Sequence, residues 1–396
     1  MHRTLALVAT AIAAIAQSAP PSSGFDHVAA VYHERIRQAG IVGSGLAYVQ
    51  DGAIAATAFE GYQDLQTKRP IDENTIYHWA SITKTLTGVA IMQLRDRGLL
   101  SLDDPAVKYV AELREVHNPY GDISQVTIRH LMTHSAGFRA ATWPWGGDQP
   151  WHPFEPTRWE QVVAMFPYTE LMFRPGTKYS YSNPGVIFLG RIIQLLSGDD
   201  YEVYIAKNIF MPLGMTRSFF DRAPYHLVGH RSHSYTRSDE GLKEQRFDFD
   251  TGITVSNGGL NAPLGDMARW LAFLIGSTPD ARIRESWDAL LKRSSIDEMF
   301  TAQIRAKEGE GGSGSDVQAG LSCFVERYQG IELVGHSGDQ NGFISHLYLH
   351  RPSKSGYIVS FNTDVASARD ARRTTRAVDN DVRDAFVREL FREARR

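Results

Sequence analysis

The chain of 396 residues has little of several features that define other protein classes. It has a single cysteine, Cys323, so neither an intramolecular disulfide nor a cysteine-based zinc site can form. Its 42 lysines and arginines nearly balance 45 aspartates and glutamates, so no overall charge recruits nucleic acid or an anionic membrane. With 42% hydrophobic and 22% charged residues, the composition is globular and excludes collagen, coiled coil and general disorder. Because Cys323 lies in an alternating apolar stretch, we expect it to be buried rather than nucleophilic.

The sequence also lacks an apolar run long enough to span a membrane. The N-terminal run from Leu5 to Ala16 has roughly a dozen residues, whereas a spanning helix needs about 20. The run follows His2 and Arg3 and precedes a segment rich in proline, serine and glycine, which is the pattern of a secretory signal peptide. We therefore predict a signal peptide over 1–16 and export to the periplasm or the medium, without stable membrane insertion.

Strand-like segments occur near both ends of the chain, and helical patterns dominate between them. Two early runs, 44–50 and 54–59, flank an Asp-Gly turn and predict a hairpin. Short turns separate the later strand-like runs, which favours antiparallel pairing; these runs are 321–327, 331–334, 343–350 and 357–361. Helices are expected over 82–97, 126–133, 185–196, 201–209 and 264–275, and an apolar helix face in 366–396 comprises Val378, Val382, Phe386 and Leu390.

These segments assemble most simply into an α/β (α+β) fold, in which the early hairpin and the late strands share one antiparallel sheet flanked by helices. We predict a catalytic domain over 25–364, with a discontinuous α/β lobe of about 25–85 and 250–396 and a mostly helical inserted lobe of about 86–249. The helix within 365–396 should pack on the α/β lobe. A cleft between the two lobes is where a small-molecule site is expected.

The first candidate catalytic motif is Ser81-Ile82-Thr83-Lys84, which opens a predicted helix. Residues three apart share one face of a helix, so the hydroxyl and the amine should lie together. A serine at a helix start also meets free backbone N–H groups and the positive end of the helix dipole, which favour a developing oxyanion. Alone the pattern is weak, because an N-cap serine followed by a solvated lysine gives the same letters.

Two later motifs add weight to the first. Tyr181 and Asn183 lie two apart in a loop before a helix, so that a phenol and an amide can face the serine. Gly335-His336-Ser337-Gly338 follows a strand, and a polar group beside small residues on an edge strand lets a ligand backbone lie alongside. A turn with a packed tyrosine and an ordinary glycine-containing hairpin are the structural alternatives for these two motifs.

Together, Ser81-x-x-Lys84, Tyr181-x-Asn183 and His336-x-Gly338 resemble, in order and spacing, the motifs of the penicillin-recognising serine hydrolases. The greatest similarity is to class C β-lactamases and their DD-peptidase, D-amino-acid peptidase and esterase relatives. The resemblance covers about Phe25 to Asp364 and extends to other segments, which are 69–71, 128–137, 212–215, 258–260 and 335–343. It implies a β-lactamase/transpeptidase-like fold.

The resemblance also implies a mechanism without a metal or an organic cofactor. Ser81 would form the acyl-enzyme, while Lys84 and Tyr181 would share the proton transfers, with the resting base left open between them. Asn183 would hold Lys84 and contact the substrate amide. The backbone N–H groups of Ser81 and Asp339 would form the oxyanion hole.

Two positions in the third motif bear on the substrate. The β-lactamases of this group usually carry lysine where this chain has His336, and a histidine titrating near pH 6.5 loses its charge in the neutral range. The carboxylate of Asp339 would disfavour an anionic substrate group unless an arginine compensates for it. We therefore expect a small ester or a D-amino-acid peptide as substrate, bound around Asn183, His336, Gly338 and Asp339. A class C-like β-lactamase and a penicillin-acylated sensor without turnover are the alternatives, and oligomeric state is left open.

Two other enzyme classes fit the sequence less well. The α/β-hydrolase elbow Gly-x-Ser-x-Gly would need glycine at Asp339. The pair His130 and His134 lacks the glutamate of a zincin, so both are expected to be structural histidines flanking a loop.

Four of the seven tryptophans fall within 140–168, where an apolar acyl pocket and a packing cluster are equally compatible with the sequence. The segment 308–315 is predicted to be a glycine-rich loop rather than a phosphate cradle.

Overall fold

A nine-stranded antiparallel sheet forms the centre of the protein in a computed structural model, which describes residues 23–139, 156–245, 251–306, 315–366 and 370–392. The strand order is β3-β2-β1-β14-β13-β12-β11-β10-β9. Strands from both ends of the chain therefore meet, as predicted, with β1 beside β14 and Tyr48 opposite Tyr357. The strands are β1 (Gly43–Gln50), β2 (Ala53–Asp64), β3 (Arg69–Pro70), β9 (Ile304–Arg305), β10 (Ser315–Ala319), β11 (Phe324–Tyr328), β12 (Ile331–Gln340), β13 (Phe343–His350) and β14 (Ser355–Phe361).

The predicted hairpin at the start of the sheet is confirmed. Gln50 pairs with Ala53, and the two turn residues between them, Asp51 and Gly52, have φ values of 51° and 81°. Two positive φ values match the two-residue turn that follows the twist of antiparallel strands, and aspartate and glycine tolerate them. Local turn chemistry thus sets the register that places β1 against β14.

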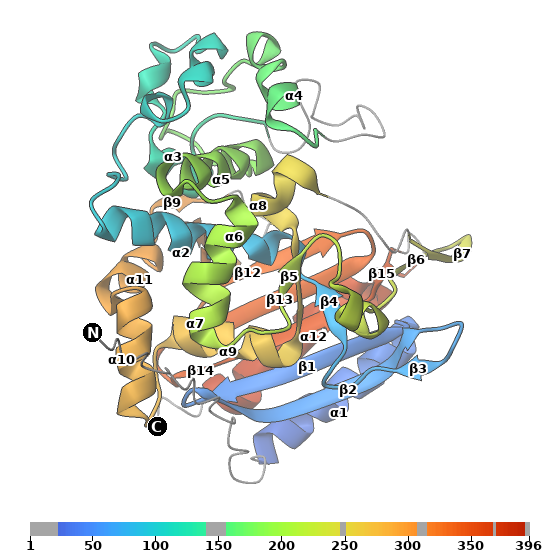
Figure 1. Ribbon diagram of the computed structural model, residues 1–396. Helices are drawn as coiled ribbons and strands as arrows, with labels where there is room; N and C mark the ends of the chain where they lie inside the picture. Colours follow the sequence, from blue (N-terminus) through green and yellow to red (C-terminus); the bar gives the residue numbers. More distant parts are fainter. Residues whose placement is uncertain (1–22, 140–155, 246–250, 307–314, 367–369, 393–396) are drawn as a thin grey trace, which may run out of the picture.

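Helices cover both faces of the sheet (Figure 1). On one face α1 (Ser23–Ala39) and α12 (Thr375–Phe386) pack against Leu46 and Val359, and on the other α9 (Leu264–Ile275) packs near Ala47 and Ile358. Adjacent residues of one strand point to opposite faces, so β14, buried along its whole length, joins both cores. Burying each large aliphatic side chain contributes about 1.5–3 kcal/mol, which holds the two ends of the chain together.

The remaining helical segments lie mostly on the α9 side and above it in the view of Figure 1. Predicted helices over 82–97, 126–133, 185–196 and 264–275 are confirmed with small shifts at their ends, whereas 201–209 divides into α6 and a π-helical turn, Ala206–Phe210. These helices are α2 (Thr83–Asp96), α3 (Ile128–Met132), α4 (Trp159–Val163), α5 (Asn183–Ser197), α6 (Tyr201–Ile205), α7 (Met211–Leu213), α8 (Val255–Gly258), α10 (Ala281–Leu290) and α11 (Arg293–Met299). Two small sheets complete the fold, with β4 (Ile76–His78), β5 (Phe219–Phe220) and β8 (Leu260–Pro263) in one and β6 (Tyr235–Ser238), β7 (Gly241–Glu244) and β15 (Thr363–Val365) in the other.

The C-terminal helix begins later than its charge pattern suggested. The helix α12 starts at Thr375, because the side chain of Thr374 accepts a hydrogen bond from the backbone N–H of Ala377 and caps it. The apolar face is buried as predicted at Val378, Val382 and Phe386, and a π-helical turn, Val387–Phe391, continues it.

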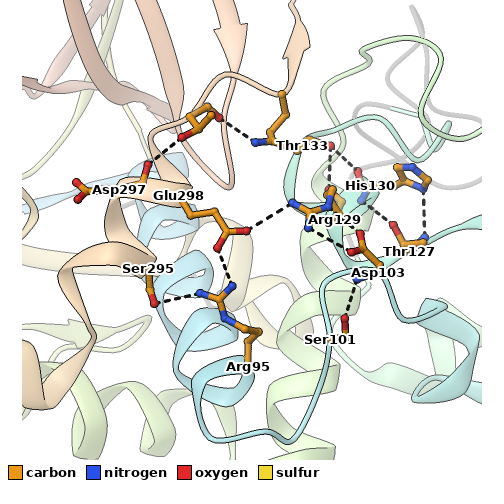
Figure 2. Close-up of polar contacts among 12 residues, drawn as sticks. Arg95, Ser101, Asp103, Thr127, Arg129, His130, Thr133, Ser295, Asp297 and Glu298 are labelled. Carbon is orange, nitrogen blue, oxygen red and sulfur yellow. Dashed lines mark hydrogen bonds and ion pairs between the residues drawn. The ribbon is translucent and has the colours of Figure 1, made fainter.

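An ion-pair network ties α11 to α2 and to the start of α3 (Figure 2). Glu298 lies 2.7 Å from Nη1 of Arg95 and 3.7 Å from Nη1 of Arg129, and Arg129 Nε lies 2.8 Å from Asp103. Chained pairs of this kind stabilise more than isolated surface pairs. The network fixes the N-terminal end of α3, whose other end leads into the site described below.

Several sequence-based expectations fall on residues that the structure does not describe. These are the signal peptide over 1–16, the segment 308–314 and the tryptophan-rich segment up to 155. Trp159, within the described part, is buried and packs edge-on against Phe166 and Phe188, so it serves packing. Among the described residues no helix is long and apolar enough to cross a membrane.

Candidate active site

Ser81 and Lys84 lie side by side at the start of α2, as their spacing predicts. Ser81 sits in a 3₁₀ turn, Ala80–Ile82, and Lys84 in the first turn of α2. Nζ of Lys84 donates hydrogen bonds to Ser81 Oγ at 2.9 Å and to the carbonyl oxygen of Asn257 at 2.8 Å. Lys84 is fully buried, so its amine is shielded from bulk water. The arrangement holds an amine on a serine hydroxyl, away from bulk water.

The backbone just before Ser81 is held in an uncommon conformation. Ala80 has a φ of 46°, a left-handed conformation that costs a non-glycine residue about 1 kcal/mol or more. Trp79 supplies the support, because its N–H and its indole Nε1 donate to the carbonyls of Leu260 and Ala262 at 2.8 and 2.9 Å. The small sheet of β4 and β8 thus fixes the turn that presents Ser81.

Tyr181 and Asn183 approach from the start of α5. Ser182 is the N-cap of that helix, with Oγ accepting from the N–H of Gly185 at 3.1 Å, so the two motif residues flank the cap. Nζ of Lys84 lies 4.9 Å from the centre of the Tyr181 ring, within the range of a cation–π contact. The structure therefore brings the tyrosine ring to the amine that contacts Ser81, in one cavity that Ser81 and Tyr181 both line.

The implied contact between Asn183 and Lys84 is not made. Oδ1 of Asn183 is buried and has no hydrogen-bond partner within the described residues. The carbonyl of Asn257, at the C-terminal end of α8, accepts from Lys84 instead. Sequence reasoning singled out the neighbouring segment 258–260 but missed Asn257, because a backbone carbonyl carries no residue-type signal.

The third motif lies inside β12 rather than in a turn after it. The neighbouring strand β11 pairs with β12 only up to Gly335 opposite Phe324, so 336–340 lack a partner from β11. A Cβ on Gly338 would lie 2.3 Å from the carbonyl oxygen of Trp79, which only glycine permits. This stretch of β12, which pairs with β13 on its other side, is therefore packed against the segment that carries Ser81.

His336 is neutral at physiological pH, which corrects the expected loss of charge in the neutral range. Its side chain is only 3% exposed. Burial, and then the charge of Lys84, lower the pKa of His336 to about 3. Nδ1 lies 2.6 Å from the carbonyl oxygen of Ser337, so Nδ1 carries the proton and donates it. Nε2 is then a hydrogen-bond acceptor, and no described residue donates to it.

Asp339 has the arginine partner that the sequence left open. Arg376 of α12 donates from Nη2 to the Asp339 carboxylate, and both groups are partly exposed. Burial raises the pKa of Asp339, while Arg376 opposes that effect. The pair offsets the negative charge at this end of the third motif.

One cavity of about 550 Å³ brings the predicted residues together. Lys84 is buried and does not line it; the predicted residues that do are Ser81, Tyr181, Asn183, His336, Gly338 and Asp339. Ser337 also lines it but sits within antiparallel β12 rather than on a strand–helix turn, so it is no nucleophile elbow. Cys323, as expected, is buried, and burial raises its pKa to about 12. The cavity extends to Asp379 and Arg383 of α12.

Two aromatic side chains beside the site were not among the predicted site residues: His134, which was expected to be structural, and Phe324, which the sequence did not single out. The ring of His134 lies 4.4 Å from that of Tyr181, and the ring of Phe324 lies 5.1 Å from that of His336. His130 instead contacts Thr127 and Gln125, so the two histidines do not share one site. Phe324 had no signal beyond its place in a strand.

Comparisons with known proteins agree with this geometry. Protein flp of Staphylococcus aureus (strain COL) is 25% identical over 322 residues, which cover 81% of this chain and 60% of that protein; the chain thus spans less than two thirds of this curated relative. The structure resembles the octameric penicillin-binding protein homologue from Pyrococcus abyssi, with 29% identity, a TM-score of 0.71 and coverage of 86% and 74% of the two chains.

A second solved structure has the same fold at lower identity. The D-amino acid amidase from Ochrobactrum anthropi SV3 superposes with a TM-score of 0.72 at 19% identity, over 93% of this chain and 99% of that chain. The family model described as Beta-lactamase matches residues 28–380, which confirms the resemblance drawn from the motifs. The chain therefore belongs to the Beta-lactamase family.

Proposed function

We propose that this protein is a serine hydrolase that acts on ester or amide substrates through an acyl-enzyme on Ser81. The observation that carries the proposal is the 2.9 Å contact between Lys84 Nζ and Ser81 Oγ in a cavity that Tyr181 also lines. A serine hydroxyl is a weak nucleophile until a neighbouring base takes its proton. The amine and the phenol supply that base, and they act as one coupled unit.

The reaction then runs in two balanced steps. Ser81 Oγ attacks the substrate carbonyl carbon, its proton passes to the Lys84–Tyr181 unit, and that unit returns a proton to the leaving alcohol or amine. Water next attacks the acyl-enzyme, gives up one proton to the same unit and releases the acid, while Ser81 Oγ regains its proton. The N–H groups of Ser81 and Asp339 stabilise the oxyanion in both steps, and losing one such donor typically costs about 100-fold or more in rate.

The acyl donor is a small ester or a D-amino-acid amide or peptide rather than an anionic β-lactam. A neutral His336 offers no positive charge to a substrate carboxylate, whereas a lysine at this position would. Asn183, with an unused buried oxygen, is placed to accept a substrate N–H. Both features favour substrates that bring hydrogen-bond donors rather than a carboxylate.

A substrate panel tests the proposal. Nitrophenyl acetate, a D-alanyl amide and a chromogenic cephalosporin are each followed for product and for a mass increment on Ser81. We expect turnover of the ester or the D-alanyl amide with a transient acyl increment. Turnover of the cephalosporin alone would identify a β-lactamase, a stable cephalosporin adduct without turnover of any donor would identify a sensor, and no adduct with any donor would refute the proposal.

We also propose that the chain is exported with removal of 1–16, on the pattern of its N-terminal sequence. Expression of the full chain in a bacterial host, followed by mass analysis of the secreted and periplasmic fractions, tests this. A product starting near Gln17 in those fractions is expected. Retention of Met1 on protein confined to the cytoplasm would contradict export.

A further inference from the structure

We propose that His134 is a positioning residue that holds Tyr181 near Ser81 and Lys84, by accepting hydrogen bonds from the backbone on both sides of Tyr181. The inference rests on the proposed function, because it concerns the proton-transfer step of the same site. It begins from a pair of hydrogen bonds. The carbonyl oxygen of His134 accepts from the N–H of Ser180 at 2.8 Å, and its Nδ1 accepts from the N–H of Ser182 at 3.1 Å.

The second of these bonds fixes the tautomer of His134. A backbone N–H only donates, so Nδ1 must carry a lone pair, and the neutral ring carries its proton on Nε2. Burial, followed by the charge of Lys84, lowers the pKa of His134 well below its usual value. Protonation would turn Nδ1 into a donor that faces another donor. The hydrogen bond from Ser182 to His134 therefore requires the neutral ring.

Aromatic packing fixes the ring of His134 laterally. Its centre lies 4.4 Å from that of Tyr181, 6.0 Å from that of Tyr179 and 6.3 Å from that of Phe324, with which it is stacked. The side chain is 3% exposed. A ring enclosed in this way has one orientation, so the position of Nδ1, and with it that of Ser182, is fixed.

The backbone of His134 is itself anchored to α3. Its φ of 55° lies in the left-handed region, which histidine and asparagine adopt more readily than most residues. Ser135, the next residue, donates its N–H to the carbonyl of His130 at 2.9 Å and accepts from the N–H of Gly176 at 2.8 Å. The Arg129 network holds the start of α3 in place (Figure 2). The hydrogen bonds on either side of Tyr181 are therefore anchored, through His134, to a helix that is itself fixed.

Two substitutions separate positioning from bulk stability. In His134→Asn the side-chain oxygen takes the place of Nδ1 and accepts from Ser182, and asparagine tolerates the positive φ. In His134→Phe the ring remains but the acceptor is lost. Because a misplacement of about 1 Å can cost roughly 100-fold in rate, we expect His134→Phe to lower kcat on nitrophenyl acetate by about 10- to 100-fold, with KM nearly unchanged. His134→Asn should keep most of kcat.

A double-mutant cycle with Tyr181→Phe tests whether His134 acts through the phenol. In the Tyr181→Phe background, His134→Phe is expected to change kcat by less than about threefold, because coupled residues are non-additive. The control Val28→Ala, a buried residue of α1 in the core beneath the opposite face of the sheet, should lower Tm without a matching loss of kcat. Equal losses in His134→Asn and His134→Phe, or full multiplicative losses in the cycle, would overturn the proposal.

A readout without turnover separates this proposal from the proposed function. The ¹³Cζ resonance of labelled Tyr181, assigned with Tyr181→Phe, should shift in His134→Phe and stay in place in His134→Asn. If the wild-type protein transfers no acyl group to Ser81, the proposed function fails while this resonance still reports on positioning. If the resonance does not shift in His134→Phe, His134 does not position Tyr181.

Discussion

The two faces of the central sheet treat buried charge in opposite ways. On the α12 face, buried acidic groups lie beside basic side chains, as in Glu326 with Arg383 at 2.7 Å and Asp379 with the imidazole of His346 at 2.5 Å. On the crevice face, Lys84 donates to two neutral oxygens, and two imidazoles beside it are kept uncharged. An ion pair neutralises the buried carboxylate on the first face, whereas on the second the charge of Lys84 and burial keep the neighbouring imidazoles neutral, as the proposed proton transfer requires.

The largest expected effect separates chemistry from stability on the crevice face. Replacing Ser81 with alanine removes the proposed nucleophile, so we expect turnover of the best substrate to fall by at least about 10³-fold and the acyl mass increment to vanish. The melting temperature should stay close to that of wild type, because Ser81 is only partly buried. Ser286→Ala, on α10, is the matched control. Retained turnover in Ser81→Ala would remove Ser81 from the mechanism.

The next largest effect is a loss of stability on the α12 face of the sheet. The side chains of Glu326 and Arg383 are 3% and 4% exposed, so Arg383→Met leaves a carboxylate buried without its cation, and a loss of about 3–5 kcal/mol in unfolding free energy is expected. Adding Glu326→Leu should recover much of that loss. Urea unfolding of the two variants measures both values. A small loss in Arg383→Met would show that this face does not depend on its ion pair.

The pH dependence of stability tests the uncharged imidazoles. The pKa of His336 is lowered from 6.5 to about 3, so below about pH 6.5 the unfolded chain binds a proton that the folded chain does not. Stability is therefore full above that pH and falls as the solution becomes more acidic, by up to about 2 kcal/mol at pH 5 for one such group. His336→Gln should remove that part of the decline between pH 7.5 and 5 in urea unfolding.

The control for this experiment is His117→Gln, because the side chain of His117 is 65% exposed. This variant is expected to follow the wild-type decline. If His336→Gln and the wild type decline equally, His336 does not hold a neutral ring in the folded protein.

The smallest expected effect lies at the rim between the two faces. Asp339 and Arg376 have side chains 45% and 68% exposed, so Arg376→Gln should cost less than about 1 kcal/mol in stability. It leaves the Asp339 carboxylate without its counter-charge, so KM for an anionic acyl donor should rise a few-fold while that for nitrophenyl acetate stays unchanged. Equal changes in both KM values would show that the pair acts through packing rather than charge.

Local rules made much of the architecture predictable from the sequence. The Asp51-Gly52 turn, the apolar faces of α9 and α12 and the alternating strands each depend on neighbours close along the chain. The serine–lysine pair was predictable for the same reason, since residues three apart share a helix face whatever the rest of the fold does. The later start of α12 was not, because a cap at Thr374 outweighed the periodic pattern before it.

The sequence alone therefore determined the family, the sheet built from both ends of the chain and the residues that form the proposed active site. Only the tertiary structure decided that the Asn257 carbonyl, rather than Asn183, accepts a hydrogen bond from Lys84, and that His336 is neutral. It also decided that Arg376 pairs with Asp339 and that His134 packs beside Tyr181. The physical reason is that hydrogen-bond partners and desolvation depend on which distant segments fill the space around a group, and letter patterns do not record that space.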